Sequence, residues 1–133
     1  MLDTHQKIKD ATGFVIVTAE YNCSLPPALT NLLDHFPLPS YRHKPASIAS
    51  YSMGSLGGTR AAALARPFLS ELGMVTLPSV VLIPTVQNAK IAEDGEVDDN
   101  ERLVNSSNKM CKELVWYMDA LQTQAEKAGG NPN

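Results

Sequence analysis

Two loops of this sequence carry the residue types best suited to holding a ligand. The first, Glu20-Tyr21-Asn22, combines a carboxylate, an aromatic ring and an amide directly after an apolar run. The second, Ser52-Met53-Gly54-Ser55-Leu56-Gly57-Gly58, is rich in glycine and serine. Successive backbone N–H groups in such a loop attract electron-rich oxygens, and glycines let the backbone approach a flat ligand closely. The two loops therefore indicate ligand binding through the backbone, with Tyr21 as a stacking wall.

Each loop also has an interpretation without a ligand. The glycines of 52–58 are not spaced as G-x-G-x-x-G, and no Lys-Ser/Thr pair follows them, so a tight strand-to-helix turn explains them equally well. The segment 20–22 is equally compatible with a solvated loop. For Glu20, a carboxylate that orders its loop is a better interpretation than a general base. Arg60 fits a contact to a cofactor phosphate or a partner subunit, and equally a surface ion pair.

The cysteines and histidines give weaker signals. Cys23 borders the first loop, where a small space-filling side chain is a better interpretation than a reactive thiol. Cys23 and Cys111 lie far apart, and the first ten residues lack the apolar segment of a signal peptide, so we expect reduced thiols. The three histidines show no metal-ligand spacing, and no metal site is predicted.

Strands and helices alternate along the chain. The continuous apolar, β-branched run at 13–19 predicts a strand buried on both faces, as in a parallel sheet. Pro78 indicates an irregular or edge strand, and Gly73 a helix end. The other expected strands cover 46–51 and 80–83, the expected helices run over 24–36, from Thr59 to Leu72 and from Asp98-Asp99 to about Leu121, and Asp94-Gly95 is an expected turn.

This alternation predicts an α/β domain with a parallel sheet covered by helices on its faces. In such sheets, ligands bind beyond the carboxyl ends of the strands. The segments 20–22 and 52–58 follow neighbouring strands, so both are expected to line one site.

Composition and charge argue against several classes of protein. The 133 residues are 44% hydrophobic and 19% charged, which is enough chain for one domain with a buried core. We expect residues 1–128 to form this domain and 129–133 a flexible tail. The net charge of −3 disfavours a nucleic-acid binder, and the apolar runs are too short to cross a membrane. We therefore expect a cytoplasmic protein with no nucleic-acid or membrane partner.

A series of short motifs along the chain matches a known pattern. They are Phe14-Val-Ile-Val-Thr-Ala-Glu-Tyr-Asn22, Ser24-Leu-Pro26, Ala28-Leu-Thr-Asn31, Asp34, Lys44-Pro45, Ser50-Tyr-Ser52, Gly54-Ser-Leu-Gly-Gly-Thr-Arg-Ala61, Glu113-Leu-Val-Trp-Tyr117 and Ala120-Leu121. In this order, these motifs resemble the NADPH-dependent FMN reductase family, a flavodoxin-like group of quinone, chromate and azo reductases. The resemblance extends from about Ile8 to Leu121.

The resemblance implies a three-layer α/β/α fold and FMN-dependent transfer of hydride from NADPH or NADH to a small-molecule acceptor, such as a quinone or free flavin. Because the flavin carries this chemistry, no catalytic side chain is implied. Ala19 stands where the family usually has proline, and Met53, near a position where glycine is common, would narrow the pocket. The implied cofactor-binding residues are Ala19, Glu20, Tyr21, Asn22, Ser52, Met53, Gly54, Ser55, Gly57 and Gly58.

By the same resemblance, the first strand here corresponds to the family's third, so the N-terminal βαβ unit with its phosphate-binding loop is expected to be absent. Losing that anchor should weaken FMN binding. The strand containing Phe14–Val17 should then present an apolar edge that favours pairing with another chain. We expect a homo-oligomer; a poorly stable monomer and an incomplete gene sequence are alternatives. A second hypothesis is a truncated, catalytically impaired paralogue that acts as a binding or subunit-interaction module.

Overall fold

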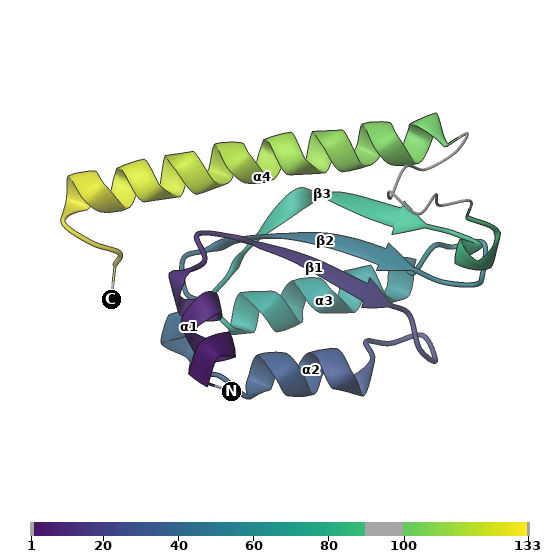
Figure 1. The fold of residues 1–133 in the computed structure, drawn as a ribbon, viewed down its shortest axis with the longest axis horizontal. Helices are drawn as coiled ribbons and strands as arrows, with labels where there is room; N and C mark the ends of the chain where they lie inside the picture. The colour runs from purple at the N-terminus through teal and green to yellow at the C-terminus, as the bar shows by residue number, and fades with distance from the viewer. Residues whose placement is uncertain (1, 90–99, 133) are drawn as a thin grey trace.

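The protein has three parallel strands between two layers of helices (Figure 1). The structure, a computed structural model, describes residues 2–89 and 100–132. The strands β1 (Phe14–Ala19), β2 (Pro45–Tyr51) and β3 (Val75–Ile83) are neighbours in that order. Helices α1 (Leu2–Asp10), α2 (Pro27–Asp34) and α3 (Thr59–Glu71) lie on one side of the sheet, and α4 (Glu101–Ala128) lies on the other. The predicted α/β/α architecture with a parallel sheet is confirmed.

The main core lies between the sheet and the layer of α1, α2 and α3. Ile16 of β1 and Ile48 of β2 point into this layer and pack with Leu33, Phe36 and Leu69 from the helices. On the other face, Ala49 of β2, Val81 of β3 and Met110 of α4 form a smaller cluster. Burial of these side chains is the main favourable contribution to folding, because it removes apolar surface from water.

The strand β1 lies at the edge of the sheet and is covered on one face only. Val15 is 44% exposed and Val17 is 61% exposed, because α4 packs on β3 and β2 and does not extend over β1. The prediction of a strand buried on both faces is therefore wrong for β1. The expected apolar edge is confirmed, since β1 pairs only with β2 among the described strands.

Most of the residues that were predicted to start or end a helix do so in the structure. Pro27 starts α2, where its missing N–H costs nothing, and Gly73 follows α3 with φ = +89°. Helix α2 stops at Asp34, earlier than expected, and the short 3₁₀ helix η1 (Leu38–Ser40) follows. Helix α1 was not expected. Helix α4 begins at Glu101 after Asn100, whose side chain accepts from Leu103 N at 3.0 Å. The expected turn at Asp94-Gly95 and the acidic pair Asp98-Asp99 lie outside the described residues.

Strand β3 is irregular around Pro78, as predicted. Its register against β2 shifts between the pairs Ala46–Thr76 and Ile48–Val80. Side chains from both neighbouring helices bond the backbone there. Arg66 of α3 donates to the carbonyl oxygens of Leu77 and Pro78 at 2.9 Å each, and Glu113 of α4 accepts from Ser79 N at 3.0 Å. These contacts replace ladder hydrogen bonds that the irregularity removes.

The last helix ends at Ala128, and Gly129 closes it with φ = +75°. Residues 129–132 that follow are exposed, in keeping with the expected tail, although its flexibility stays a prediction. None of the helices in the described ranges combines the length and the apolar character that crossing a bilayer requires.

Candidate functional site

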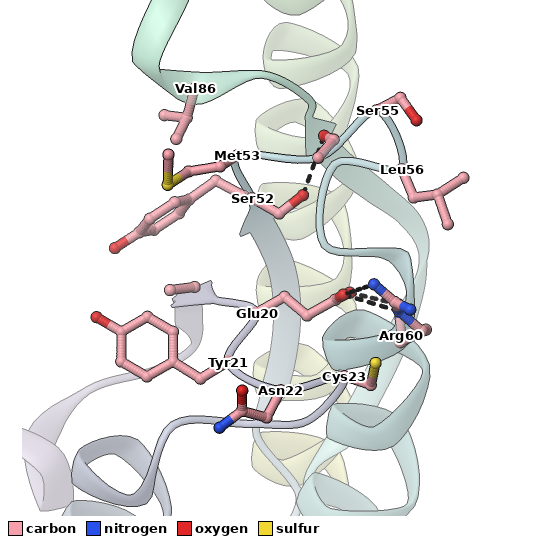
Figure 2. A pocket seen from close by; sticks show the side chains of 13 residues that line it. Glu20, Tyr21, Asn22, Cys23, Ser52, Met53, Ser55, Leu56, Arg60 and Val86 are labelled. Carbon is pink, nitrogen blue, oxygen red and sulfur yellow. Dashed lines mark hydrogen bonds and ion pairs between the residues drawn. The ribbon is translucent and has the colours of Figure 1, made fainter.

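The loops that follow all three strands meet at the carboxyl edge of the sheet and enclose a cavity of about 750 Å³ (Figure 2). A volume of this size is typical of sites for small molecules and cofactors. The residues that line the cavity come from the ends of the strands, the loops that follow them and the first turn of α3. They are Ala19 at the end of β1 with Glu20, Tyr21, Asn22 and Cys23 after it, Tyr51 at the end of β2 with Ser52, Met53, Gly54, Ser55 and Leu56 after it, Val86 after β3, and Arg60 of α3.

The loop after β1 is a tight turn from Tyr21 to Ser24. The backbones of these two residues exchange hydrogen bonds in both directions, at 3.0 and 2.9 Å. Between them, Asn22 and Cys23 both have positive φ angles, 50° and 64°. This conformation is uncommon for residues other than glycine and recurs at functional sites. The turn presents its backbone and the exposed ring of Tyr21 to the cavity.

The loop after β2 is held by the side chain of Ser52. Its Oγ donates to Gly54 O at 3.2 Å and accepts from Gly58 N at 3.1 Å. Gly57 and Gly58 close this loop, with φ angles of +60° and +80°. A Cβ atom at Gly57 would stand 2.9 Å from the backbone nitrogen of Pro84, which is too close for a side chain. Both glycines are buried and do not line the cavity.

The third loop was not included among the predicted site residues. It contains the short 3₁₀ helix η2 (Val86–Asn88) and is hydrogen-bonded to the second loop. Val86 N donates to Ser52 O at 3.1 Å, Thr85 N donates to Gly54 O at 3.1 Å, and Gln87 Nε2 donates to Met53 O at 3.2 Å. Figure 2 shows Val86 beside Met53 on the same wall of the cavity. The rule that ligands bind beyond the carboxyl ends of parallel strands, applied to β3 as well, points to this loop.

Glu20 and Arg60 form the charged pair of the cavity. The Glu20 side chain is 4% exposed and extends toward Arg60, 40 residues further along the chain (Figure 2). Its carboxylate accepts from Arg60 Nε at 2.8 Å, from Arg60 Nη2, and from the backbone nitrogens of Arg60 at 3.0 Å and Ala61 at 3.4 Å. The Arg60 guanidinium holds the pKa of Glu20 below its ordinary value of 4.5. These bonds agree with the interpretation of Glu20 as a carboxylate that orders its loop, and that role stays a prediction.

The surface left for a ligand is made of backbone amides and neutral side chains. Among the described residues, the N–H groups of Asn22, Cys23 and Ser55 have no protein acceptor. Arg60 is the one cationic side chain among the lining residues that the structure describes, and Glu20 engages it. Tyr21, Met53 and Val86 add apolar surface. The residues present therefore fit a flat, uncharged heteroaromatic ring such as that of a flavin, and they offer no free cation for a phosphate.

Eight of the ten predicted residues line this cavity together, and two do not. Gly57 and Gly58 were predicted to bind the cofactor, but the structure places them behind the loop, where they shape it. Cys23, Tyr51, Leu56, Arg60 and Val86 line the cavity without having been predicted as cofactor-binding residues. Cys23 and Arg60 had been noted beside the site, whereas Tyr51 and Leu56 were overlooked although they lie within or next to the predicted segments. The binding roles of all these residues stay predictions.

The sheet and the cavity at its carboxyl edge define an α/β protein with a ligand site built from strand-to-helix loops. The family model described as NADPH-dependent FMN reductase matches residues 1–88, and the chain belongs to this family. A solved structure of FerB, a flavoenzyme NAD(P)H:(acceptor) oxidoreductase from Paracoccus denitrificans, superposes with a TM-score of 0.71 at 23% identity, over 92% of this chain and 67% of that one. The flavodoxin-like fold is thereby confirmed.

Curated relatives are named as reductases. A quinone reductase of Escherichia coli (strain K12) is 36% identical over 102 residues, which are 74% of this chain and 54% of that protein. A 2-hydroxy-1,4-benzoquinone reductase of Burkholderia sp is 29% identical over 118 residues, 86% of this chain and 64% of that protein. An NADPH azoreductase of Bacillus sp. (strain OY1-2) is 27% identical over 123 residues, 92% of this chain and 65% of that protein. The chain thus spans between about half and two thirds of the length of these relatives.

Proposed function

We propose that this protein is a flavin-dependent oxidoreductase that binds FMN in the cavity at the carboxyl edge of the sheet and uses NADPH or NADH to reduce a quinone-type acceptor. Membership of the family and the names of the relatives support this proposal. The observation that carries it is the composition of the cavity wall, where two lining loops combine backbone N–H groups that have no acceptor among the described residues with aromatic and apolar side chains.

The protein's own contribution is to hold and orient the cofactor. The backbone amides of Asn22, Cys23 and Ser55 would donate to polar atoms of the ring. Tyr21 and Met53 would cover its apolar surface. When bound, FMN supplies the hydride and electron transfer, so the protein needs no acid or base of its own for that step. Glu20 is committed to Arg60, which agrees with a role in shape and not in proton transfer.

The direct test is FMN binding by the purified, folded chain. We expect a yellow protein whose flavin fluorescence is changed by binding, and we expect NADPH oxidation when a quinone is added. Tyr21→Ala should weaken FMN binding by roughly tenfold, as loss of an aromatic stacking partner does. Trp116→Ala removes an equally exposed aromatic side chain from α4, outside the cavity, and should leave binding unchanged.

A folded chain that stays colourless at saturating FMN would overturn the proposal. That outcome would favour the second hypothesis, in which the chain is a binding or subunit-interaction module. If the chain binds FMN but oxidises no NADPH, the proposed binding site would be supported and the proposed enzymatic activity would be wrong.

We further propose that two copies of the chain associate through β1. The support is that β1 is an edge strand among the described elements and that two of its side chains, Val15 and Val17, are exposed. Antiparallel pairing of two β1 strands would join the sheets and bring these valines into cross-strand contact with their copies. We expect a dimer in sedimentation analysis, and Val17→Lys should shift it to a monomer. Leu64→Lys, at an exposed leucine of α3, is the control. A wild-type monomer would contradict this arrangement.

The cytoplasmic location also stays a prediction.

A further inference from the structure

The first turn of α3 is hydrogen-bonded to a buried carboxylate from the protein itself, that of Glu20. The N-terminus of a helix has unpaired N–H groups and a partial positive charge, and it commonly attracts an anionic ligand. In this protein, Glu20 occupies that position by accepting from the backbone nitrogens of Arg60 and Ala61. The helix has no side-chain cap of its own, because its N-cap residue is Gly58.

The same carboxylate links two loops that line the cavity. Glu20 follows β1, and its backbone N–H donates to Tyr51 O at the end of β2 at 2.9 Å. Its side chain reaches α3, which the loop 52–58 precedes directly. Glu20 is therefore bonded to both sides of the second loop, and it also begins the first. A carboxylate with four donors and 4% exposure has little freedom to move.

We propose that Glu20 is a positioning residue, which as the internal anion of α3 fixes the spacing between the loops 20–24 and 52–58 and thereby the width of the cavity. The expected consequence is that the cavity takes the uncharged ring of FMN and not an anionic group. This consequence rests on the proposed function. Glu20 already occupies Arg60 Nε, Arg60 Nη2 and the first amides of α3, so a phosphate would have to compete with this carboxylate for those donors.

The closing experiment compares wild type with Glu20→Gln and Glu20→Ala in the free protein and with FMN. Glu20→Gln keeps the size and one acceptor oxygen but loses the charge, and Glu20→Ala removes both. The control, Asp3→Asn, removes the carboxylate of another ion pair, Asp3–Lys7, which is exposed on α1 and remote from the cavity. The readouts are backbone amide NMR spectra of the free protein and dissociation constants for FMN and for lumiflavin, which lacks the phosphate.

In the free protein, both Glu20 variants should shift amide resonances of Tyr21, Asn22 and residues 53–56 together with those of Arg60 and Ala61. In the Glu20→Ala variant, added inorganic phosphate should also shift the amide resonances of Arg60 and Ala61. In wild type it should not. Lumiflavin and FMN should both bind more weakly, by roughly tenfold for Glu20→Gln. Asp3→Asn should change none of these quantities.

Shifts confined to Arg60 and Ala61, with flavin affinity unchanged, would mean that Glu20 only caps the helix and would overturn the inference. Failure of wild type to bind FMN would overturn the proposed function instead. In that case, the amide shifts of the free protein still decide whether Glu20 positions the two loops.

Discussion

Ser50 Oγ donates a hydrogen bond to the carbonyl oxygen of Gly58 at 2.9 Å, which fixes the end of β2 to the start of α3. The contact requires that residue 58 have no side chain. Gly58 has φ = +80°, and an added Cβ would overlap the Ser50 side chain and stand 2.9 Å from Tyr51 N. The second loop therefore depends on a glycine that never reaches the cavity.

Gly58→Ala is expected to destabilise the fold. The substitution combines a disfavoured positive φ with a clash against backbone, so we expect the free energy of unfolding to fall by about 2 kcal/mol or more. Chemical denaturation followed by circular dichroism measures this loss. Gly54→Ala is the matched control from the same loop, because its nearest atom, Ser52 Oγ, would be 3.9 Å away. Equal stability of the two variants would show that the close approach at Gly58 is not needed.

Arg66→Met is expected to loosen the irregular part of β3. Arg66 donates to two carbonyl oxygens at 2.9 Å each, at Leu77 and Pro78, and its removal leaves both without this partner. Charged hydrogen bonds of this kind suggest a loss of about 1–2 kcal/mol. Hydrogen exchange should show faster opening around residues 76–80. Lys109→Met, on the exposed side of α4, should have no comparable effect.

Acidification is expected to release the bond between Glu20 and α3. The pKa of Glu20 is depressed in the folded state, first by the Arg60 side chain and then by two backbone amides, while burial opposes the shift. A group with a depressed folded pKa contributes stability above its unfolded pKa, and this contribution disappears as pH falls through the folded pKa. Cys23 is the other titratable group that interacts with Arg60 in this cluster.

The measurement is the unfolding free energy of wild type and Glu20→Gln between neutral pH and pH 3. The difference in unfolding free energy between wild type and Glu20→Gln should be constant above pH 4.5, the ordinary pKa of a glutamate. It should shrink as the pH falls below that value. An advantage that does not change with pH would show that the carboxylate charge contributes nothing.

FMN is expected to protect one cysteine from alkylation and not the other. Cys23 and Cys111 are both exposed thiols, but Cys23 lines the cavity and Cys111 lies on α4. Mass spectrometry after a short treatment with iodoacetamide should show slower labelling of Cys23 when FMN is present. Labelling of Cys111 serves as the internal control. Equal labelling of Cys23 with and without FMN would place the flavin elsewhere.

The sequence by itself determined most of the local elements and two of the three loops that line the cavity. Pro27, Gly73 and Pro78 marked a helix start, a helix end and an irregular strand correctly, because each acts through its own backbone geometry. The alternation of strands and helices was enough to place 20–22 and 52–58 at one edge of a parallel sheet.

Tertiary structure alone decided which distant residues meet. The pairing of Glu20 with Arg60, across 40 residues, is a long-range contact, and a local pattern carries no information about the partner. Likewise, the exposure of Val17 depends on where α4 packs, and the position of Gly58 behind its loop depends on Ser50. Residue types and their period determine what an element can bury, but the packing of neighbouring elements decides what it does bury and which side chains reach the cavity.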